Sequence, residues 1–200
     1  MPLVEIIVGK ETGAEAIAKA LDYVRQIGKT PIVVNDSRGF YTSRCFGTYV
    51  GEGQEMLAEG IAPAIIDNVG RMTGMPRGPL ELADDVALDL AYKVREQTRK
   101  DLGDRYVAGA SDRLIEAMVV KEGRPGRKNQ KGFYDYPANG PKTLWRGLSD
   151  IVDIKVTQAE PPAVEELKKR FLYRQAVEAA RCFEEGVVTD PRDADVGAIL

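Results

Sequence analysis

Acid–base chemistry in this chain has few candidate side chains, because none of its 200 residues is histidine. Histidine is the usual general base near neutral pH and the commonest protein ligand of transition metals. Any proton transfer within the chain would therefore fall to carboxylates, lysines or tyrosines. For the same reason we predict no metal site.

The carboxylate of Glu5 is the first candidate, since Glu5 lies in the middle of the apolar run Leu3–Val8. If that run is an edge strand, Glu5 simply faces solvent. If the run is buried, the carboxylate needs a partner, because an isolated buried charge is costly. A histidine held by a carboxylate is one familiar arrangement, but this chain has no histidine to offer.

The second candidate is the basic loop at residues 122–142, EGRPGRKNQKGFYDYPANGPK. It is either a solvated loop that its aromatic residues hold against neighbouring helices, or a loop whose cations meet an anionic ligand. Lysine acts as a point charge toward phosphate. The cations concerned would be Arg127, Lys128 or Lys131.

A buried strand followed by a helix must position these residues. Pro31–Val34 is a β-branched run without polar alternation, which is typical of a strand covered on both faces. Asn35, Asp36 and Ser37 follow it, and their side chains are predicted to cap the next helix. The exit of such a strand is where open α/β sheets form ligand crevices.

The N-terminal segment predicts a strand, a helix and a second strand. A right-handed crossover would make the strands at Leu3–Val8 and Pro31–Val34 parallel. Two strands do not form a stable sheet alone. We therefore expect the edge of a larger doubly wound domain whose earlier strands are missing.

Beyond the second strand the apolar periodicity is helical throughout. A long helix ends at Gly60, and Gly53 on its apolar stripe suggests that another helix crosses closely. The sequence GMPRGP, Gly74–Pro79, predicts a rigid loop. The remaining predicted helices begin at Pro63, cover Leu80–Leu102 with a bend near Asp84–Val86, cover Ser111–Val120, and begin at Pro161.

The last helix repeats an earlier one, which indicates duplication of a helical unit. Four residues recur at a constant offset. They are Arg44, Glu52, Glu59 and Gly60 in the first copy, and Arg170, Glu178, Glu185 and Gly186 in the second. The second copy stops at Leu200 and is expected to be truncated.

Composition excludes several partners. The net charge of −3 gives no basic footprint, so neither nucleic acid nor an anionic lipid surface is suggested. No apolar run is long enough to span a bilayer. The two cysteines, Cys45 and Cys182, do not indicate a disulfide framework. A reducing cytoplasm is the expected compartment.

Four ordered blocks, MPLVEII, GKTPIVVNDSRGFYTSR, GMPRGPLELAD and GRKNQKGFYDY, resemble the 3-hydroxyacyl-CoA dehydrogenase family, especially its bacterial multifunctional members of fatty acid oxidation. The resemblance covers essentially the whole chain. It implies a mainly α fold, in which a helical C-terminal domain follows the last β-α-β edge of a Rossmann domain. The expected domains are the Rossmann edge at 1–35, the helical domain at 36–137, a linker at 138–160 and a truncated second helical copy at 161–200.

The resemblance also implies roles for individual residues. Glu5 matches the glutamate that orients a catalytic histidine, which in the family pattern lies upstream of Met1. Ser43 stands where many members have an asparagine that contacts the acyl thioester. Lys128 matches a lysine that approaches NAD. The segment facing the acyl cleft is matched by Met75, Pro76 and Gly78, although a purely structural hinge is equally compatible with that loop.

The function implied is NAD-dependent oxidation of L-3-hydroxyacyl-CoA to 3-ketoacyl-CoA in fatty acid β-oxidation. The chain would supply a cleft wall, the histidine-orienting glutamate and a homodimerisation surface, and by itself would be inactive. Multifunctional members also carry an enoyl-CoA hydratase domain, and a thiolase subunit is a further expected partner. The alternative from another class is a non-catalytic helical dimerisation or interaction module.

Overall fold

The computed structural model describes residues 2–154 and 163–200. The chain divides into two compact units. The first contains the described residues of Met1–Thr48 and Tyr173–Leu200, and the second contains those of Tyr49–Leu172. Two long helices, α2 (Thr42–Ala58) and α8 (Val164–Glu184), contribute one segment to each unit.

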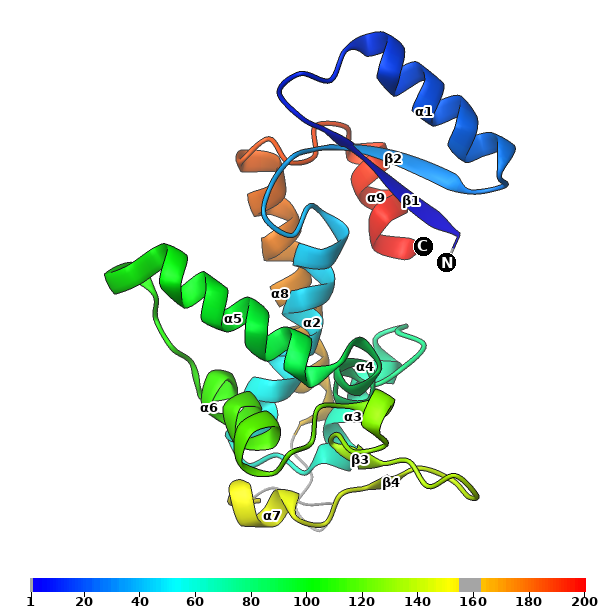
Figure 1. The fold of residues 1–200 in the computed structure, drawn as a ribbon. Coiled ribbons are helices and arrows are strands. Elements are labelled where there is room, and N and C mark those ends of the chain that lie inside the picture. The colour runs from blue at the N-terminus through cyan, green and yellow to red at the C-terminus, as the bar shows by residue number, and fades with distance from the viewer. Residues whose placement is uncertain (1, 155–162) are drawn as a thin grey trace. The chain divides into compact units, whose positions relative to one another are not determined.

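The first unit contains a two-stranded parallel sheet, as predicted. Strand β1 (Leu3–Val8) pairs with β2 (Thr30–Asn35) from Leu3 opposite Thr30 to Val8 opposite Asn35. The crossover helix α1 (Ala14–Gln26) covers one face of the sheet, and α9 (Pro191–Ile199) covers the other (Figure 1). Covered in this way, Ile32 and Val34 are almost fully buried.

The prediction for the start of α2 was wrong. The helix begins at Thr42, so Asn35, Asp36 and Ser37 lie too far upstream to serve as its N-cap residue. The intervening turn contains Gly39 and Phe40, both with positive φ. The side-chain amide of Asn35 instead donates to the carbonyl of Gly186 (2.7 Å).

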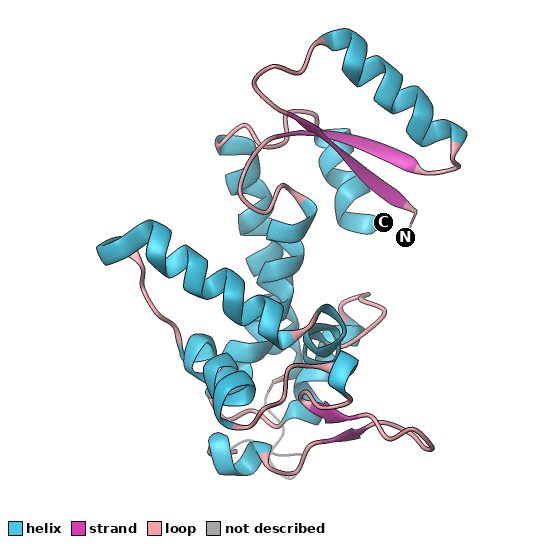
Figure 2. Cartoon of the chain, in the orientation of Figure 1, coloured by secondary structure: helices cyan, strands magenta, loops and turns pink. Residues whose placement is uncertain are grey.

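The second unit is helical, with one small hairpin (Figure 2). Its helices after α2 are α3 (Pro63–Met72), α4 (Pro79–Val86), α5 (Leu88–Leu102), α6 (Ala110–Glu116) and α7 (Leu148–Ile151). A π-helical turn (Ala117–Lys121) extends α6, and 3-10 turns lie at Gly103–Arg105 and Arg127–Asn129. The hairpin joins β3 (Tyr134–Asp135) to β4 (Thr143–Leu144).

Three local features of this unit bear on the sequence predictions. The stretch Leu80–Leu102 is two helices broken at Ala87, whose φ is +89°, and not one bent helix. The β3–β4 hairpin was not predicted. The helix expected from Pro161 has its first two residues outside the described part of the chain, and α8 is described from Val164. The predicted linker likewise falls in part on residues 155–160, which are not described.

The close approach predicted at Gly53 is confirmed. A Cβ atom on Gly53 would lie 2.5 Å from Cγ of Pro79, the first residue of α4. Such a distance leaves no room for any side chain larger than hydrogen. The apolar core of this unit surrounds the contact and includes Tyr49, Ile66 and Leu80.

The residues that match between the two helical copies bind one another. In the first unit, Arg44 on α2 binds Glu178 and Glu185 (2.6 and 2.5 Å). In the second unit, Arg170 on α8 binds Glu52 and Glu59 (2.6 and 2.5 Å). Each copy therefore supplies the arginine of one cluster and the glutamates of the other.

Candidate functional site

Glu5 is positioned at the first turn of α2. Its Oε1 accepts hydrogen bonds from the backbone N–H groups of Tyr41 (3.1 Å) and Thr42 (3.0 Å), and its Oε2 accepts one from the hydroxyl of Thr42 (2.5 Å). The first N–H groups of a helix have no partner within the helix, and the dipole there favours negative charge. The half-buried Glu5 carboxylate thus serves as the cap of α2, supplied by a neighbouring strand.

Ser43 follows immediately on α2 and is exposed. The helix brings Ser43 within one residue of the backbone group that Glu5 binds. Glu5 and Ser43 therefore lie in one neighbourhood of the first unit. They are 38 positions apart in the sequence, so the fold and not a local motif brings them together. The carboxylate of Glu5 can hold a cationic partner there, and the hydroxyl of Ser43 can donate one hydrogen bond.

The loop before α4 belongs to the second unit and is held by a buried acid. Gly78 is buried, and a Cβ atom on it would lie 2.2 Å from Cγ of Asp67. Asp67 accepts from the Leu80 N–H (2.8 Å) and from the Tyr134 hydroxyl (2.5 Å). Met75 is half-buried and Pro76 is exposed. This loop is anchored like a structural hinge, with Met75 packed against the apolar core.

Asp84 performs a similar role for the aromatic residues of the basic loop. Its carboxylate is fully buried and accepts from the backbone N–H groups of Phe133 (2.8 Å) and Tyr134 (2.9 Å) and from the Tyr136 hydroxyl (3.0 Å). Burial raises the pKa of Asp84 to about 6, and the three hydrogen bonds oppose that rise. Burial also raises the pKa of Asp67, with the Tyr134 hydrogen bond acting in the opposite direction.

Two of the four sequence blocks are thus joined through buried acids. Asp67 and Asp84 were missed as candidates because their partners in the basic loop lie 49 to 67 positions away. A weak signal was available for Asp67, which interrupts the apolar set of α3 and is 1% exposed. A charge on the buried stripe of a helix requires a polar partner.

The cations of the basic loop have acidic partners on α4 and α5. Lys128 Nζ lies 2.7 Å from Asp89, and Arg127 lies 2.8 Å from Asp85. The lysine lowers the pKa of Asp89, chiefly through its hydrogen bond. Of the two alternatives for this loop, the contacts of Phe133, Tyr134 and Tyr136 show aromatic anchoring, and the cations remain partly exposed at its surface.

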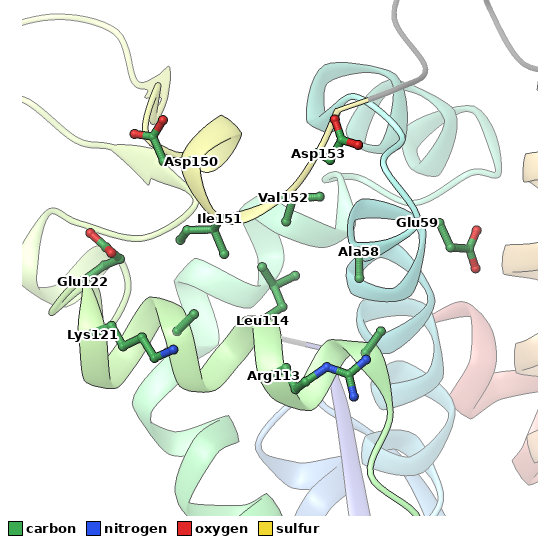
Figure 3. Close-up of a pocket in the computed structure, with 12 residues that line it drawn as sticks. Ala58, Glu59, Arg113, Leu114, Lys121, Glu122, Asp150, Ile151, Val152 and Asp153 are labelled. Carbon is green, nitrogen blue, oxygen red and sulfur yellow. The ribbon is translucent and has the colours of Figure 1, made fainter.

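A cavity of about 520 Å³ among the described residues contains none of the predicted site residues. It lies between α6 and the segment around α7. Figure 3 shows an apolar centre and a charged rim. The centre is formed by Leu114, Ile151 and Val152, and the rim carries Arg113, Lys121, Glu122, Asp150 and Asp153.

The described residues contain neither a cluster suited to a metal ion nor a helix suited to a membrane. No group of three or more acidic or cysteine side chains is placed to hold a metal ion. Within the same described ranges, no helix combines the length and apolarity needed to cross a membrane.

Two family models match the chain in series. Residues 1–37 match the model described as 3-hydroxyacyl-CoA dehydrogenase, NAD binding domain, and residues 39–136 match the model described as its C-terminal domain. Together they cover both the strand–helix–strand edge and most of the helices. The boundary between the two models falls in the turn before α2.

Curated relatives match over the whole chain. The fatty acid oxidation complex subunit alpha of Shewanella baltica (strain OS185) is 38% identical over 204 residues, and that of Shewanella frigidimarina is 39% identical over 206 residues. The alignments cover 100% of this chain and 28% of each relative. The chain therefore spans little more than a quarter of the length of these relatives.

Solved structures show the same fold. The dehydrogenase part of multifunctional enzyme 1 from C. elegans matches with a TM-score of 0.72 and 28% identity, covering 100% of this chain and 45% of that one. (S)-3-hydroxybutyryl-CoA dehydrogenase from Ralstonia eutropha matches with a TM-score of 0.57 and 34% identity, covering 68% and 48%.

Proposed function

We propose, since this chain belongs to the 3-hydroxyacyl-CoA dehydrogenase family, that it forms part of an enzyme that oxidises L-3-hydroxyacyl-CoA to 3-ketoacyl-CoA with NAD. The observation that carries the proposal is the placement of Glu5. Its carboxylate is fixed by three hydrogen bonds at the first turn of α2, one residue before Ser43. A fixed, charged carboxylate is what a general-base histidine needs to become an imidazolium.

In this proposal Glu5 is a positioning residue. The histidine that it orients would be supplied by a part of the enzyme outside these residues, and would take the proton of the substrate hydroxyl. Ser43 would donate one hydrogen bond to the thioester carbonyl. Met75, Pro76 and Gly78 would form part of the wall of the acyl cleft, held by Asp67.

The described residues do not build a complete site for NAD. The one candidate, Lys128, is bound to Asp89, and the chain contains no glycine-rich dinucleotide fingerprint. When it is bound to the whole enzyme, NAD would accept the hydride that leaves C3 of the substrate. We assign Lys128 only an electrostatic contribution to that binding, and no step of the reaction to this chain's contacts with the cofactor.

The proposal extends to partners. The substrate is an acyl-CoA, the enzyme forms a homodimer, and a thiolase subunit joins it in a complex. The names of the Shewanella relatives, which are alpha subunits of a fatty acid oxidation complex, support assembly into a complex. Because the chain spans 28% of those relatives, the 200-residue chain by itself is expected to be inactive.

The test is the substitution Glu5→Gln in the intact enzyme. Glutamine retains a carbonyl oxygen for the Tyr41 and Thr42 N–H groups but loses the charge. We expect kcat for acetoacetyl-CoA reduction by NADH to fall by about 10² or more, with little change in KM or melting temperature. The matched control is Glu11→Gln, which removes an exposed glutamate of the same unit.

Full kcat in the Glu5→Gln enzyme would reject the catalytic role of Glu5. Turnover above buffer by the purified 200-residue chain would contradict its expected inactivity. The non-catalytic interaction module remains the second candidate, because Glu5 and Lys128 both have structural partners in the fold. That candidate requires the Glu5→Gln substitution to alter stability and to leave turnover unchanged.

A further inference from the structure

A second cavity, about 320 Å³, lies beside α4 and is lined by cations from three separate segments. Arg77 comes from the loop before α4, Arg127 from the 3-10 turn of the basic loop, and Lys142 from the residue before β4. All three belong to the second unit. Arg127 is one of the loop cations that the sequence offered for an anionic ligand, whereas Arg77, Lys142 and the cavity itself have no role in the proposed reaction.

The cations around this cavity outnumber their acidic partners. Arg77 and Arg127 both bind Asp85, the latter at 2.8 Å. Lys142 binds Glu81, which Arg71 also approaches (3.8 Å). The three cations that line the cavity, Arg77, Arg127 and Lys142, therefore share two carboxylates at its surface. Three cations that converge on one cavity favour an anionic ligand between them.

Two of the cations lie over aromatic rings whose hydroxyl groups donate hydrogen bonds to buried carboxylates. The guanidinium of Arg127 lies 5.4 Å from the ring centroid of Tyr136, whose hydroxyl donates to the buried Asp84. The ammonium of Lys142 lies 4.6 Å from the ring centroid of Tyr134, whose hydroxyl donates to the buried Asp67. These anchored rings limit the motion of both cations and so reduce the entropy lost on binding.

We propose that this cavity binds the phosphate groups of a nucleotide ligand. Guanidinium groups bind phosphate oxygens in paired hydrogen bonds, and a lysine adds a point charge. Arg77 and Arg127 each donate to Asp85 through Nη1, and among the described residues their Nη2 groups make no hydrogen bond and can bind a ligand. The choice of a nucleotide rests on the proposed function, since acyl-CoA and NAD both carry phosphates.

The experiment is a calorimetric titration of the 200-residue chain with three probes. Adenosine 3′,5′-bisphosphate represents the nucleotide of coenzyme A, ADP-ribose represents that of NAD, and inorganic pyrophosphate represents the anion alone. We expect saturable 1:1 binding of at least one probe. The probe that binds most tightly identifies the source of the phosphate.

Two substitutions should act in opposite directions. Arg127→Gln should weaken binding about tenfold or more, because it removes a charged donor. Asp85→Asn should strengthen binding several-fold, because both arginines lose their competing partner. The control Arg105→Gln removes an exposed cation that does not line the cavity and should leave binding unchanged.

Absence of saturable binding for all three probes would overturn the proposal. Equal weakening by Arg127→Gln and Arg105→Gln would also overturn it, because it would indicate general charge attraction. So would weaker binding after Asp85→Asn, provided that the circular dichroism spectrum of that variant is unchanged. These readouts do not depend on turnover. Loss of the dehydrogenase assignment would therefore leave a positive binding result intact, and the reverse also holds.

Discussion

Asp84 is a buried acid whose burial costs free energy and whose hydrogen bonds offset part of that cost. Its carboxylate lies among Asp67, Tyr134 and Tyr136, and three donors satisfy it. Burial still dominates and raises its pKa from 3.8 to about 6. The folded state therefore holds this proton to a higher pH than the unfolded state does. The contribution of Asp84 to the free energy of unfolding is largest below the unfolded pKa and declines as the pH rises through 6.

The free energy of unfolding should depend on pH differently in the wild type and in Asp84→Asn. We expect the free energy of unfolding of the wild type, relative to the variant, to fall by about 2 kcal/mol between about pH 4 and about pH 7. Urea denaturation followed by circular dichroism at several pH values measures this difference. The exposed Asp104→Asn is the control, and a constant difference across this range would show that the pKa of Asp84 is not raised.

At the level of single residues, sequence reasoning found Glu5 but missed what binds it. An acid in an apolar strand signals that some partner is needed. The partner proved to be the backbone of Tyr41 and Thr42, which no local pattern identifies because it lies 36 and 37 positions away. Lys128 was selected by resemblance, and its pairing with Asp89 depends on how α5 packs.

Three helix starts among the described residues receive a carboxylate from another element. Glu5 of β1 caps α2, Asp67 of α3 caps α4, and Glu55 of α2 accepts from the Ser111 N–H in α6 (3.1 Å). The local N-cap positions of α4 and α6 are glycines, Gly78 and Gly109, which leave room for the incoming carboxylates.

Most elements were predictable, since apolar periodicity and glycine stops set the helix ends near Gly60 and Gly74. The break at Ala87 was not, because nothing in the local sequence favours a positive φ at an alanine. There the Leu88 N–H donates to the carbonyl of Pro125 (2.9 Å), a contact between distant segments. The β3–β4 hairpin is equally non-local, and its two-residue strands are too short to show alternation.

A matched pair of glycines in α2 tests the packing of that helix. A Cβ atom on Gly53 would overlap Pro79, whereas one on Gly51 meets nothing within 4 Å. We expect Gly53→Ala to lower the free energy of unfolding by about 1–3 kcal/mol. Gly51→Ala should raise it by about 0.5–1 kcal/mol, because alanine has the higher helix propensity. Thermal or urea unfolding measures both, and equal effects of the two substitutions would refute the close contact with α4.

At the scale of the whole chain, the internal repeat was detectable because its ends share residue types at a constant offset. The structure adds that backbone hydrogen bonds repeat too. The Ile61 N–H donates to Met56, and the Val187 N–H donates to Cys182 at the same offset. The sequence could not show that the matching arginines and glutamates bind across copies, because an offset gives equivalence and not contact.

The two arginine clusters should contribute independently to stability, because among the ion pairs of the described residues no residue belongs to both clusters. We expect Arg44→Met and Arg170→Met each to lower the free energy of unfolding by about 1–3 kcal/mol, since each removes the ion pair that a largely buried glutamate, Glu178 or Glu52, makes with that arginine. The double variant should equal the sum within about 0.5 kcal/mol. Urea denaturation measures all three, with Arg105→Met as an exposed control. A double variant no less stable than either single one would contradict independence.

The exchange of partners between the copies constrains how they can diverge. A change at Glu52 alters the environment of an arginine in the other copy, so the compensating substitution must arise more than a hundred positions away. Neither copy can therefore drift freely after duplication. Among homologous sequences, this predicts that position 44 covaries with positions 178 and 185, and position 170 with positions 52 and 59, more strongly than any of them covaries with its immediate neighbours.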